Sequence, residues 1–488
     1  MFIIMLQSKN LNVFSLAVII FSIPFFEFVR DNIYEINIIL GKSFYFLLLF
    51  TFLLILLGAF IINFLSKKID FVESLLISVI SFWILFKHNL INQFIKKNLS
   101  GNILGESFSS EFALLITIIL IVLTYIFFLK KALFFKRFCF IFFYLSFFYI
   151  FSQIIFLKIF TVENKIENKN EIIFLDKINK KKPNIYFFIL DAMQPVSGFE
   201  KYYKINLDNY LNNYENNGYV YFKNTSNLYD NTTHGLSAIF HLGHILDNDE
   251  DTIINSGELF PNILRKNKQS NLMVNLNNLN YDFKWIGNYF AYCPKFNLKH
   301  CLNQNQSKII DFYLYISFFK KSPFIQIITN LGYLVKFDFD KYLFYELHDG
   351  IGRLNNYIIE NKNLEKPTFY FVHHMSPHWP YVTNSDCSYK NYPGEENFEG
   401  YKSAYLCNLK KINETIELIN KKDPKAFVVF QSDHNWQMSK NVSEKKLIFN
   451  LVKKKNDCEF NQNINYSNVN TLRFIFSCIT GNDAQYIP

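Results

Sequence analysis

Five apolar stretches in the first 161 residues constrain the fold of this 488-residue chain more than any other feature. A helix of roughly 20 apolar residues crosses the hydrocarbon core of a bilayer, which is about 30 Å thick. Each stretch has this length or comes close to it, although Glu73 interrupts the start of the third. We therefore predict a bundle of about five transmembrane helices at residues 11–29, 44–65, 71–86, 112–129 and 138–160.

The cationic residues of this first part indicate how it would lie in a membrane. Positively charged loops stay on the cytoplasmic side. With an odd number of spans, everything after about residue 161 is then extracytoplasmic, as in a periplasmic domain anchored to a bacterial inner (plasma) membrane. The clusters follow the second and fourth stretches, at Lys67, Lys68, Lys130, Lys131, Lys136 and Arg137.

The net charge of +9 does not indicate a nucleic-acid partner. Most of the excess lies in the short loops between the apolar stretches. The remaining two thirds of the chain shows no basic stripe with interleaved aromatic residues, so we expect no binding to nucleic acid.

The seven cysteines agree with an oxidising compartment. Cys139 lies in the fifth apolar stretch, and the other six lie in the second part of the chain. An even number in an extracytoplasmic domain predicts disulfides, and we favour pairing between sequence neighbours. A metal cluster is the alternative, but no C-x-x-C spacing supports it. The favoured pairs are Cys293–Cys301, Cys387–Cys407 and Cys458–Cys478.

The second part of the chain has the pattern of a soluble α/β domain. Residues 162–182 form a charged linker, and residues 183–488 alternate short apolar runs with helical segments, which is typical of a mainly parallel sheet between helix layers. We expect helices near residues 233–246, 350–361 and 401–421. The expected strands cover residues 184–190, 219–223, 282–286, 368–372, 427–431 and 447–452.

Acids and imidazoles follow three of these apolar runs. Asp191 comes directly after the first run, His373 and His374 end the fourth, and Asp433 and His434 end the fifth. Runs that are apolar throughout are typical of parallel strands buried on both faces. Ligands of such sheets bind outside the carboxyl ends of the strands. Asp191, Asp433 and His434 therefore form a candidate site for one divalent ion. Asp191 alone could equally be a helix cap or turn residue.

A hydroxyl group lies at a predicted helix start, where it could act as a nucleophile. Thr233 precedes a helical pattern, and helix N-termini favour anions such as phosphate. A threonine oxygen that coordinates a metal could attack phosphorus while the first-turn amides stabilise the developing charge. The alternative is that Thr232 or Thr233 only caps the helix.

Three histidines lie within six residues of the chain, at 373, 374 and 378, in a chain that has ten. A loop that carries them could bind a phosphate or protonate a leaving group. Each of them alone is more typical of a buried polar residue.

Together, these motifs resemble the sulfatase-like branch of the alkaline phosphatase superfamily, and in particular its membrane-anchored lipoteichoic acid synthases, phosphoethanolamine transferases and phosphoglycerol transferases. The resemblance covers roughly residues 183–480 and is most specific at Ser432-Asp433-His434 and around Pro377-His378-Trp379. It implies an α/β/α domain like that of alkaline phosphatase. It also implies one metal ion, zinc or manganese, held by Asp191, Thr233, Asp433 and His434.

The resemblance further implies a role for each residue and a reaction. Thr233 would be the nucleophile, chosen over Thr232 by counting back from Ala238, and it would form a phospho-threonine. His378 would contact the transferred group, and His374 and His373 could assist. The donor would be a membrane phospholipid, and the acceptor would be a cell-surface glycan or lipid.

Some positions depart from the sulfatase pattern. The window from Thr233 to Ser237 lacks the C/S-x-P-x-R motif that becomes formylglycine. Ala192 stands where many sulfatases have a second acid, and Asn435 stands where many relatives have glycine. These departures favour phosphoryl transfer over sulfate hydrolysis. Ester hydrolysis, a non-catalytic scaffold for envelope glycan assembly, and a transporter with an accessory domain stay open as alternatives.

Overall fold

The first apolar third of the chain folds into long helices in the computed structural model. The structure describes residues 9–32, 42–99, 106–130, 133–160, 172–178, 180–245, 259–261, 263, 270–286, 318, 349–361, 366–390, 397–436, 446–455, 458–459 and 466–487. Two units form: residues 1–162 with 308–337, and residues 163–307 with 338–488. The sequence did not indicate that residues 308–337 group with the first unit.

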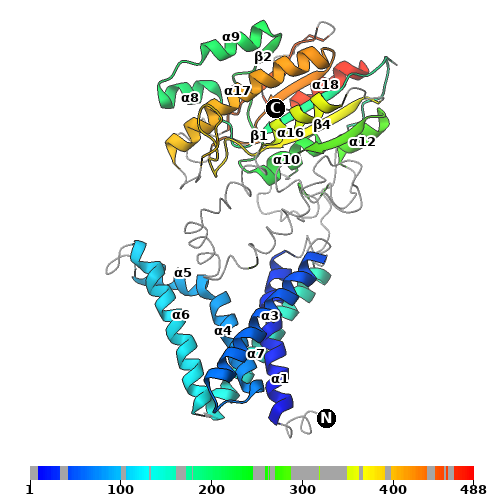
Figure 1. Ribbon diagram of the computed structural model, residues 1–488. Coiled ribbons are helices and arrows are strands. Elements are labelled where there is room, and N and C mark those ends of the chain that lie inside the picture. The colour runs from blue at the N-terminus through cyan, green and yellow to red at the C-terminus, as the bar shows by residue number, and fades with distance from the viewer. Residues whose placement is uncertain are drawn as a thin grey trace. The chain divides into compact units, whose positions relative to one another are not determined.

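The first unit is helical (Figure 1). Four of its helices are long and apolar enough to cross a membrane, and the count rises to five if α4 and α5, which meet at a bend of 45°, form one broken span. The prediction of about five spans is confirmed as a count of four to five helices that could cross a membrane. The helices are α1 (Lys9–Asp31), α3 (Lys42–Leu65), α4 (Phe71–Phe86), α5 (His88–Leu99), α6 (Glu106–Leu129) and α7 (Leu133–Phe160).

The second unit is built on one six-stranded sheet in the order β2-β6-β5-β1-β4-β3. Strand β1 lies at its centre, parallel to β5 on one side and β4 on the other, and β3 is parallel to β4. Only β6 runs antiparallel to its neighbours. The predicted, mainly parallel sheet is thus confirmed. Its strands are β1 (Ile185–Leu190), β2 (Tyr219–Tyr221), β3 (Asp282–Ile286), β4 (Thr368–His374), β5 (Phe427–Gln431) and β6 (Asn450–Lys453).

Helices cover both faces of this sheet and complete the three layers (Figure 1). One face packs against α10 (Thr232–His241), α12 (Asn271–Asn278) and α18 (Asn470–Thr480). The other packs against α8 (Val196–Tyr203), α9 (Asp208–Asn216), α16 (Gly350–Glu360) and α17 (Phe398–Lys422).

Side chains of β1 alternate between these two layers, as they must in a strand. Phe187 and Ile189 join the core on the α10 face, whereas Phe188 and Leu190 join the core on the α17 face. The four central residues of this alternation are fully buried. A strand buried on both faces has apolar side chains throughout, which explains the continuous run that the sequence shows.

Two of the three predicted disulfides are present. Cys387 bonds to Cys407 and Cys458 bonds to Cys478, so pairing between sequence neighbours is confirmed for both. Cys293 and Cys301 lie outside the described residues. Cys139 is a buried free thiol in the helical unit.

Candidate metal centre

Three buried ligand groups meet where β1 and β5 end. Asp191 follows β1 directly, and Asp433 and His434 follow β5 by two and three residues. Each is at most 1% exposed. One ligand atom from each lies within 4.8 Å of the others, a spacing that can hold one metal ion. Oxygen and imidazole ligands in this combination suit a divalent ion such as zinc or manganese.

The orientation of His434 suits metal binding. Its Nδ1 lies 2.7 Å from the carbonyl oxygen of Asn435 and donates a hydrogen to it. In the neutral ring, which is the form that binds a metal, this bond keeps the proton on Nδ1 and leaves the lone pair on Nε2. Nε2 lies 3.3 Å from Asp191 Oδ1 and 3.7 Å from Asp433 Oδ2, so the lone pair is directed into the cluster.

Asp433 has one carboxylate oxygen committed to the backbone and one available to a metal. Oδ1 accepts hydrogen bonds from the amides of Ala192, at 3.2 Å, and His434, at 2.9 Å. Oδ2 is buried and, among the described residues, has no hydrogen-bond partner. An unpartnered buried carboxylate oxygen is costly unless something charged pairs with it. The residues of this cluster therefore fit a cation.

The electrostatics of the cluster lead to the same conclusion. Burial raises the pKa of Asp433, and the charge of Asp191 raises it further. Burial also opposes ionisation of Asp191, but His378, His373 and His434 hold the pKa of Asp191 well below its usual range. Burial lowers the pKa of His434, yet Asp433 and Asp191 together raise it to about 10. The two buried carboxylates thus repel each other, and a divalent ion would neutralise their charge.

The hydroxyl group that joins the cluster belongs to Thr232. Its Oγ1 lies 3.2 Å from His434 Nε2 and 3.5 Å from Asp191 Oδ1. The cap of α10 is Asn231, whose side chain accepts a hydrogen bond from the His234 amide at 2.9 Å. Neither threonine is therefore needed as the cap. Thr232 is the first residue of the helix, so its side chain lies at the positive end of the helix dipole.

This geometry does not agree with the choice of Thr233 over Thr232. The helix begins one residue earlier than the sequence pattern indicated, and one residue is about 100° of rotation on a helix with 3.6 residues per turn. The carbonyl of Thr233 accepts a hydrogen bond from Ser237 within the same helix. We therefore transfer the proposed role of nucleophile to Thr232.

Two features of the backbone, at Ala192 and at Gly235, position the residues of the cluster. Ala192, which follows Asp191, has a positive φ of 60°, and its carbonyl accepts a hydrogen bond from the Tyr401 hydroxyl at 2.9 Å. Such a conformation is uncommon for a residue other than glycine and concentrates at functional sites. A Cβ on Gly235 in α10 would lie 3.1 Å from the Asp433 carbonyl oxygen. Glycine at this position lets α10, and with it Thr232, approach the end of β5.

His373 contacts the cluster through Asp191 and is not one of its three ligand residues. Its Nε2 is 3.2 Å from Asp191 Oδ2, and its side chain is fully buried. The proposed role in substrate binding therefore becomes a positioning role: His373 orients the Asp191 carboxylate and stabilises its charge.

His374 points to the opposite face of the sheet, because β4 continues through both histidines and successive side chains alternate. Its Nε2 lies 3.1 Å from Asn408 Oδ1 on α17, and its Nδ1 lies 3.8 Å from Asp349 Oδ1. The expectation that His374 assists substrate binding is therefore wrong for this geometry. His374 is part of a second polar cluster with Asp349 and Lys411, whose Nζ is 2.7 Å from Asp349 Oδ1.

We expect Asp349→Asn to destabilise the protein in a pH-dependent way. Burial opposes ionisation of Asp349, but Lys411 and His374 lower its pKa, so its charge stabilises the fold above the unfolded value of about 3.9. This contribution disappears as the pH falls through the folded pKa. The variant should lose about 1–2 kcal/mol at pH 7 and much less near pH 3. Thermal unfolding at both values measures this, and an equal loss at both would contradict it.

His378 lies in the loop after β4, at the rim of the cluster. Its ring centroid is 6.3 Å from that of His434, and its side chain is half-buried. Its Nδ1 lies 2.5 Å from the Trp379 carbonyl oxygen, which leaves Nε2 directed elsewhere. Of His373, His374 and His378, only His378 is exposed enough to contact a substrate.

The sulfatase family model matches residues 216–457, a region that contains Thr232, Asp433 and His434 but not Asp191. The sequence has no match among the curated proteins.

The chain also resembles two solved structures, a membrane phosphoethanolamine transferase and the periplasmic domain of a second protein. The integral membrane protein lipooligosaccharide phosphoethanolamine transferase A (EptA) from Neisseria meningitidis is 13% identical, with 95% of each chain covered and a TM-score of 0.43. The C-terminal periplasmic domain of EptC from Escherichia coli, in complex with Zn, is 14% identical, with 64% of this chain and 87% of that chain covered and a TM-score of 0.41.

The family match, the three-layer domain and the apolar helices that precede it lead to one assignment. The matched region includes the end of β5, where the candidate ligands Asp433 and His434 lie. Residues 216–457 of the chain are thus a sulfatase-like domain, and helices able to cross a membrane precede it in the chain.

Proposed function

We propose that this protein transfers a phospho-alcohol head group, of the phosphoethanolamine or phosphoglycerol type, from a membrane phospholipid to a cell-surface glycan or lipid. A phospho-threonine on Thr232 is the intermediate. One observation carries the proposal: the Thr232 hydroxyl lies 3.2 Å from His434 Nε2, inside the buried cluster of Asp191, Asp433 and His434.

Asp191, Asp433 and His434 would hold one divalent ion, zinc or manganese, and Thr232 Oγ1 would complete its coordination. A bound ion of this kind lowers the pKa of a coordinated hydroxyl and neutralises charge on the phosphate oxygens. Asp433 Oδ2 and His434 Nε2 are the atoms that the hydrogen bonds to the backbone leave available for this role.

In the first step, Thr232 Oγ1 attacks the phosphorus of the donor lipid. A bond from Oγ1 to phosphorus forms, and the bond from phosphorus to the diacylglycerol oxygen breaks. Coordination of Oγ1 to the ion would lower the pKa of the hydroxyl, so that its proton would pass to water as the attack begins. His378 at the rim is placed to donate a proton to the leaving diacylglycerol oxygen. First-turn amides of α10 face the phosphate from the positive end of the helix.

In the second step, a hydroxyl of the acceptor attacks the same phosphorus. The bond from phosphorus to Oγ1 breaks, Thr232 recovers its proton, and His378 accepts the proton of the incoming hydroxyl. Each residue thus returns to its initial state after one transfer, as a catalytic cycle requires.

The apolar helices support a lipid donor and a location in the bacterial inner membrane, with the second unit on the periplasmic side. A protein with four to five helices able to cross a membrane meets its phospholipids directly. The cationic loops near Lys67 and Lys130 support a location of the second unit outside the cytoplasm, because positive loops stay on the cytoplasmic side.

The test uses the full-length protein in liposomes whose phosphatidylethanolamine or phosphatidylglycerol carries a labelled head group. Release of diacylglycerol is expected only after zinc or manganese is supplied, and transfer of the label only after an acceptor is added. Release of free head group without an acceptor would instead establish a hydrolase. A protein that binds neither metal and releases no diacylglycerol even when zinc or manganese is supplied would support the scaffold alternative.

A further inference from the structure

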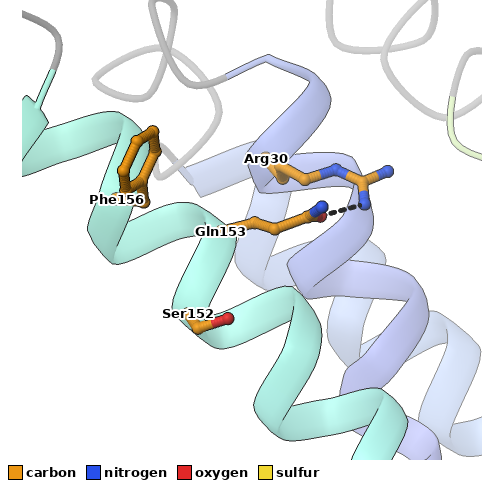
Figure 2. Close-up of a pocket in the computed structure, with 4 residues that line it drawn as sticks. All are labelled: Arg30, Ser152, Gln153 and Phe156. Atoms are coloured by element: carbon orange, nitrogen blue, oxygen red, sulfur yellow. Dashed lines mark hydrogen bonds between the residues drawn. The ribbon is translucent and has the colours of Figure 1, made fainter.

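The helical unit contains two cavities that share one residue, Arg30. The first, of about 500 Å³, is lined by Arg30 near the end of α1 and by Ser152, Gln153 and Phe156 of α7. Figure 2 shows the Arg30 guanidinium bonded to Gln153 between these two helices, at an N–O distance of 2.8 Å. The second, of about 450 Å³, is lined by apolar residues together with Glu27, Arg30, Trp83 and Lys87.

A buried ion pair lines the second cavity. Lys87 Nζ pairs with Glu27 Oε1, and Glu27 is 8% exposed. The sequence analysis did not single out this pair, although Glu27 lies inside the first apolar stretch. Ionisable residues at such positions are costly and indicate functional sites.

Two polar atoms at this cavity have no hydrogen-bond partner among the described residues. They are the acceptor Glu27 Oε2 and the donor Trp83 Nε1, and both are buried. An unpaired donor and an unpaired acceptor in an apolar setting each cost free energy. A ligand that carries both an acceptor and a positively charged donor would satisfy the two atoms together.

The bend between α4 and α5 at Lys87 leaves room for a ligand in the second cavity. This residue lies at the bend of 45° between α4 and α5, and its amide bonds back to the Trp83 carbonyl at 3.0 Å. Helices broken at membrane depth occur where they line a cavity or a binding site. Lys87 and the ends of α1 and α7 lie at the opposite end of the bundle from the cationic loops, which is the extracytoplasmic end by the positive-inside rule.

We propose that these cavities bind the head group of a zwitterionic phospholipid, one with a phosphate and a primary ammonium. The proposal rests on the proposed function, because it selects phosphatidylethanolamine over phosphatidylglycerol as the lipid that the protein recruits. Lys87, Arg30 and the indole N–H of Trp83 contact the phosphate. Glu27 Oε2 accepts a hydrogen bond from the ammonium.

The surroundings suit the remainder of such a lipid. Leu120 of α6 and Phe156 of α7, which line the two cavities, are 40% and 61% exposed. Acyl chains can lie along these side chains, where the hydrocarbon of the bilayer would otherwise contact them. The charges also balance: Glu27 and Asp31 offset Arg30 and Lys87, so a ligand without net charge leaves the site neutral.

Lipid binding is measured on full-length Thr232→Ala protein in nanodiscs, which keeps turnover out of the result. The probes are phosphatidylethanolamine, its N-acetylated form, which retains the phosphate but loses the ammonium, and phosphatidylglycerol. We expect about tenfold tighter binding of phosphatidylethanolamine than of the other two, because a charged hydrogen bond is lost with each. Glu27→Gln should abolish this preference, and Lys87→Met should weaken all three lipids.

Glu73→Gln is the matched control. Glu73 is equally buried and pairs with Lys136 at 2.7 Å in the same bundle, away from the two cavities. This variant should keep the preference. Trp83→Phe is a second variant if Glu27→Gln does not fold. It removes only the N–H and retains an aromatic ring, and it should weaken all three lipids alike, because each carries the phosphate.

Equal binding of the three lipids by the Thr232→Ala protein would overturn the inference. So would a loss of preference in Glu73→Gln as large as in Glu27→Gln, or effective competition by free phosphoethanolamine. Because binding is read without catalysis, failure of the transferase proposal would leave the lipid preference in place. Failure of the lipid site would leave transfer from either lipid in place.

Discussion

Thr232→Ala should abolish the covalent phospho-adduct and lower head-group transfer by at least about 1,000-fold, because loss of a nucleophile removes the reaction path itself. Thr232 Oγ1 is the hydroxyl that lies 3.2 Å from His434 Nε2. The measurement is diacylglycerol release from labelled lipid, with mass spectrometry of the peptide that contains residue 232.

Thr233→Ala is the matched control, since it removes the same hydroxyl one residue further along the helix. We expect it to retain most of the activity and the adduct, because its carbonyl and not its side chain supports α10. Thr232→Ser should retain part of the activity. If Thr233→Ala is inactive and Thr232→Ala is active, the assignment made from the sequence pattern is right and the one made from this geometry is wrong.

Asp433→Asn should remove metal binding. It should also change which protein is the more stable, the variant or the original, according to whether metal is present. The amide keeps an oxygen for the Ala192 and His434 N–H groups but replaces the unpartnered Oδ2 with a group that does not ligate a metal. Metal affinity should fall by at least about 100-fold, beyond the loss typical of residues that only orient a ligand. Activity should fall with it.

The stability difference follows from the two buried carboxylates. Without metal, the variant should be as stable as the original protein or more stable, because burial and the charge of Asp191 already disfavour ionised Asp433. With metal at about 100 times its Kd, only the original protein should gain about 2.7 kcal/mol. Thermal unfolding with and without zinc measures this, and Asp349→Asn serves as a control that should keep the metal-dependent gain.

The sheet and its edge could be predicted from the sequence because buried parallel strands are apolar throughout. Asp191, Asp433 and His434 stand out as the first acidic and imidazole groups after β1 and β5. The position of His374 could not be read in the same way. Its orientation depends on whether β4 ends before or after the two histidines, and one residue changes the face of the sheet.

The identity of the nucleophile also depends on a shift of one residue along the chain. Asn231, Thr232 and Thr233 can each cap a helix, and the cap fixes which side chain lies beside the metal ligands. Only the hydrogen bond from the His234 amide to Asn231 resolves the choice. The Glu27–Lys87 pair was missed for a different reason: the residues are 60 positions apart, and their contact depends on how α1 packs against the bend after α4.

Anomalous diffraction from crystals of the zinc-loaded protein tests the central claim most directly. We predict a single peak within about 2.0–2.2 Å of ligand atoms of Asp191, Asp433 and His434, the usual range for zinc with oxygen and nitrogen, with Thr232 Oγ1 as a further ligand. A peak whose coordination excludes Thr232, or zinc bound elsewhere while this cluster stays empty, would contradict the account.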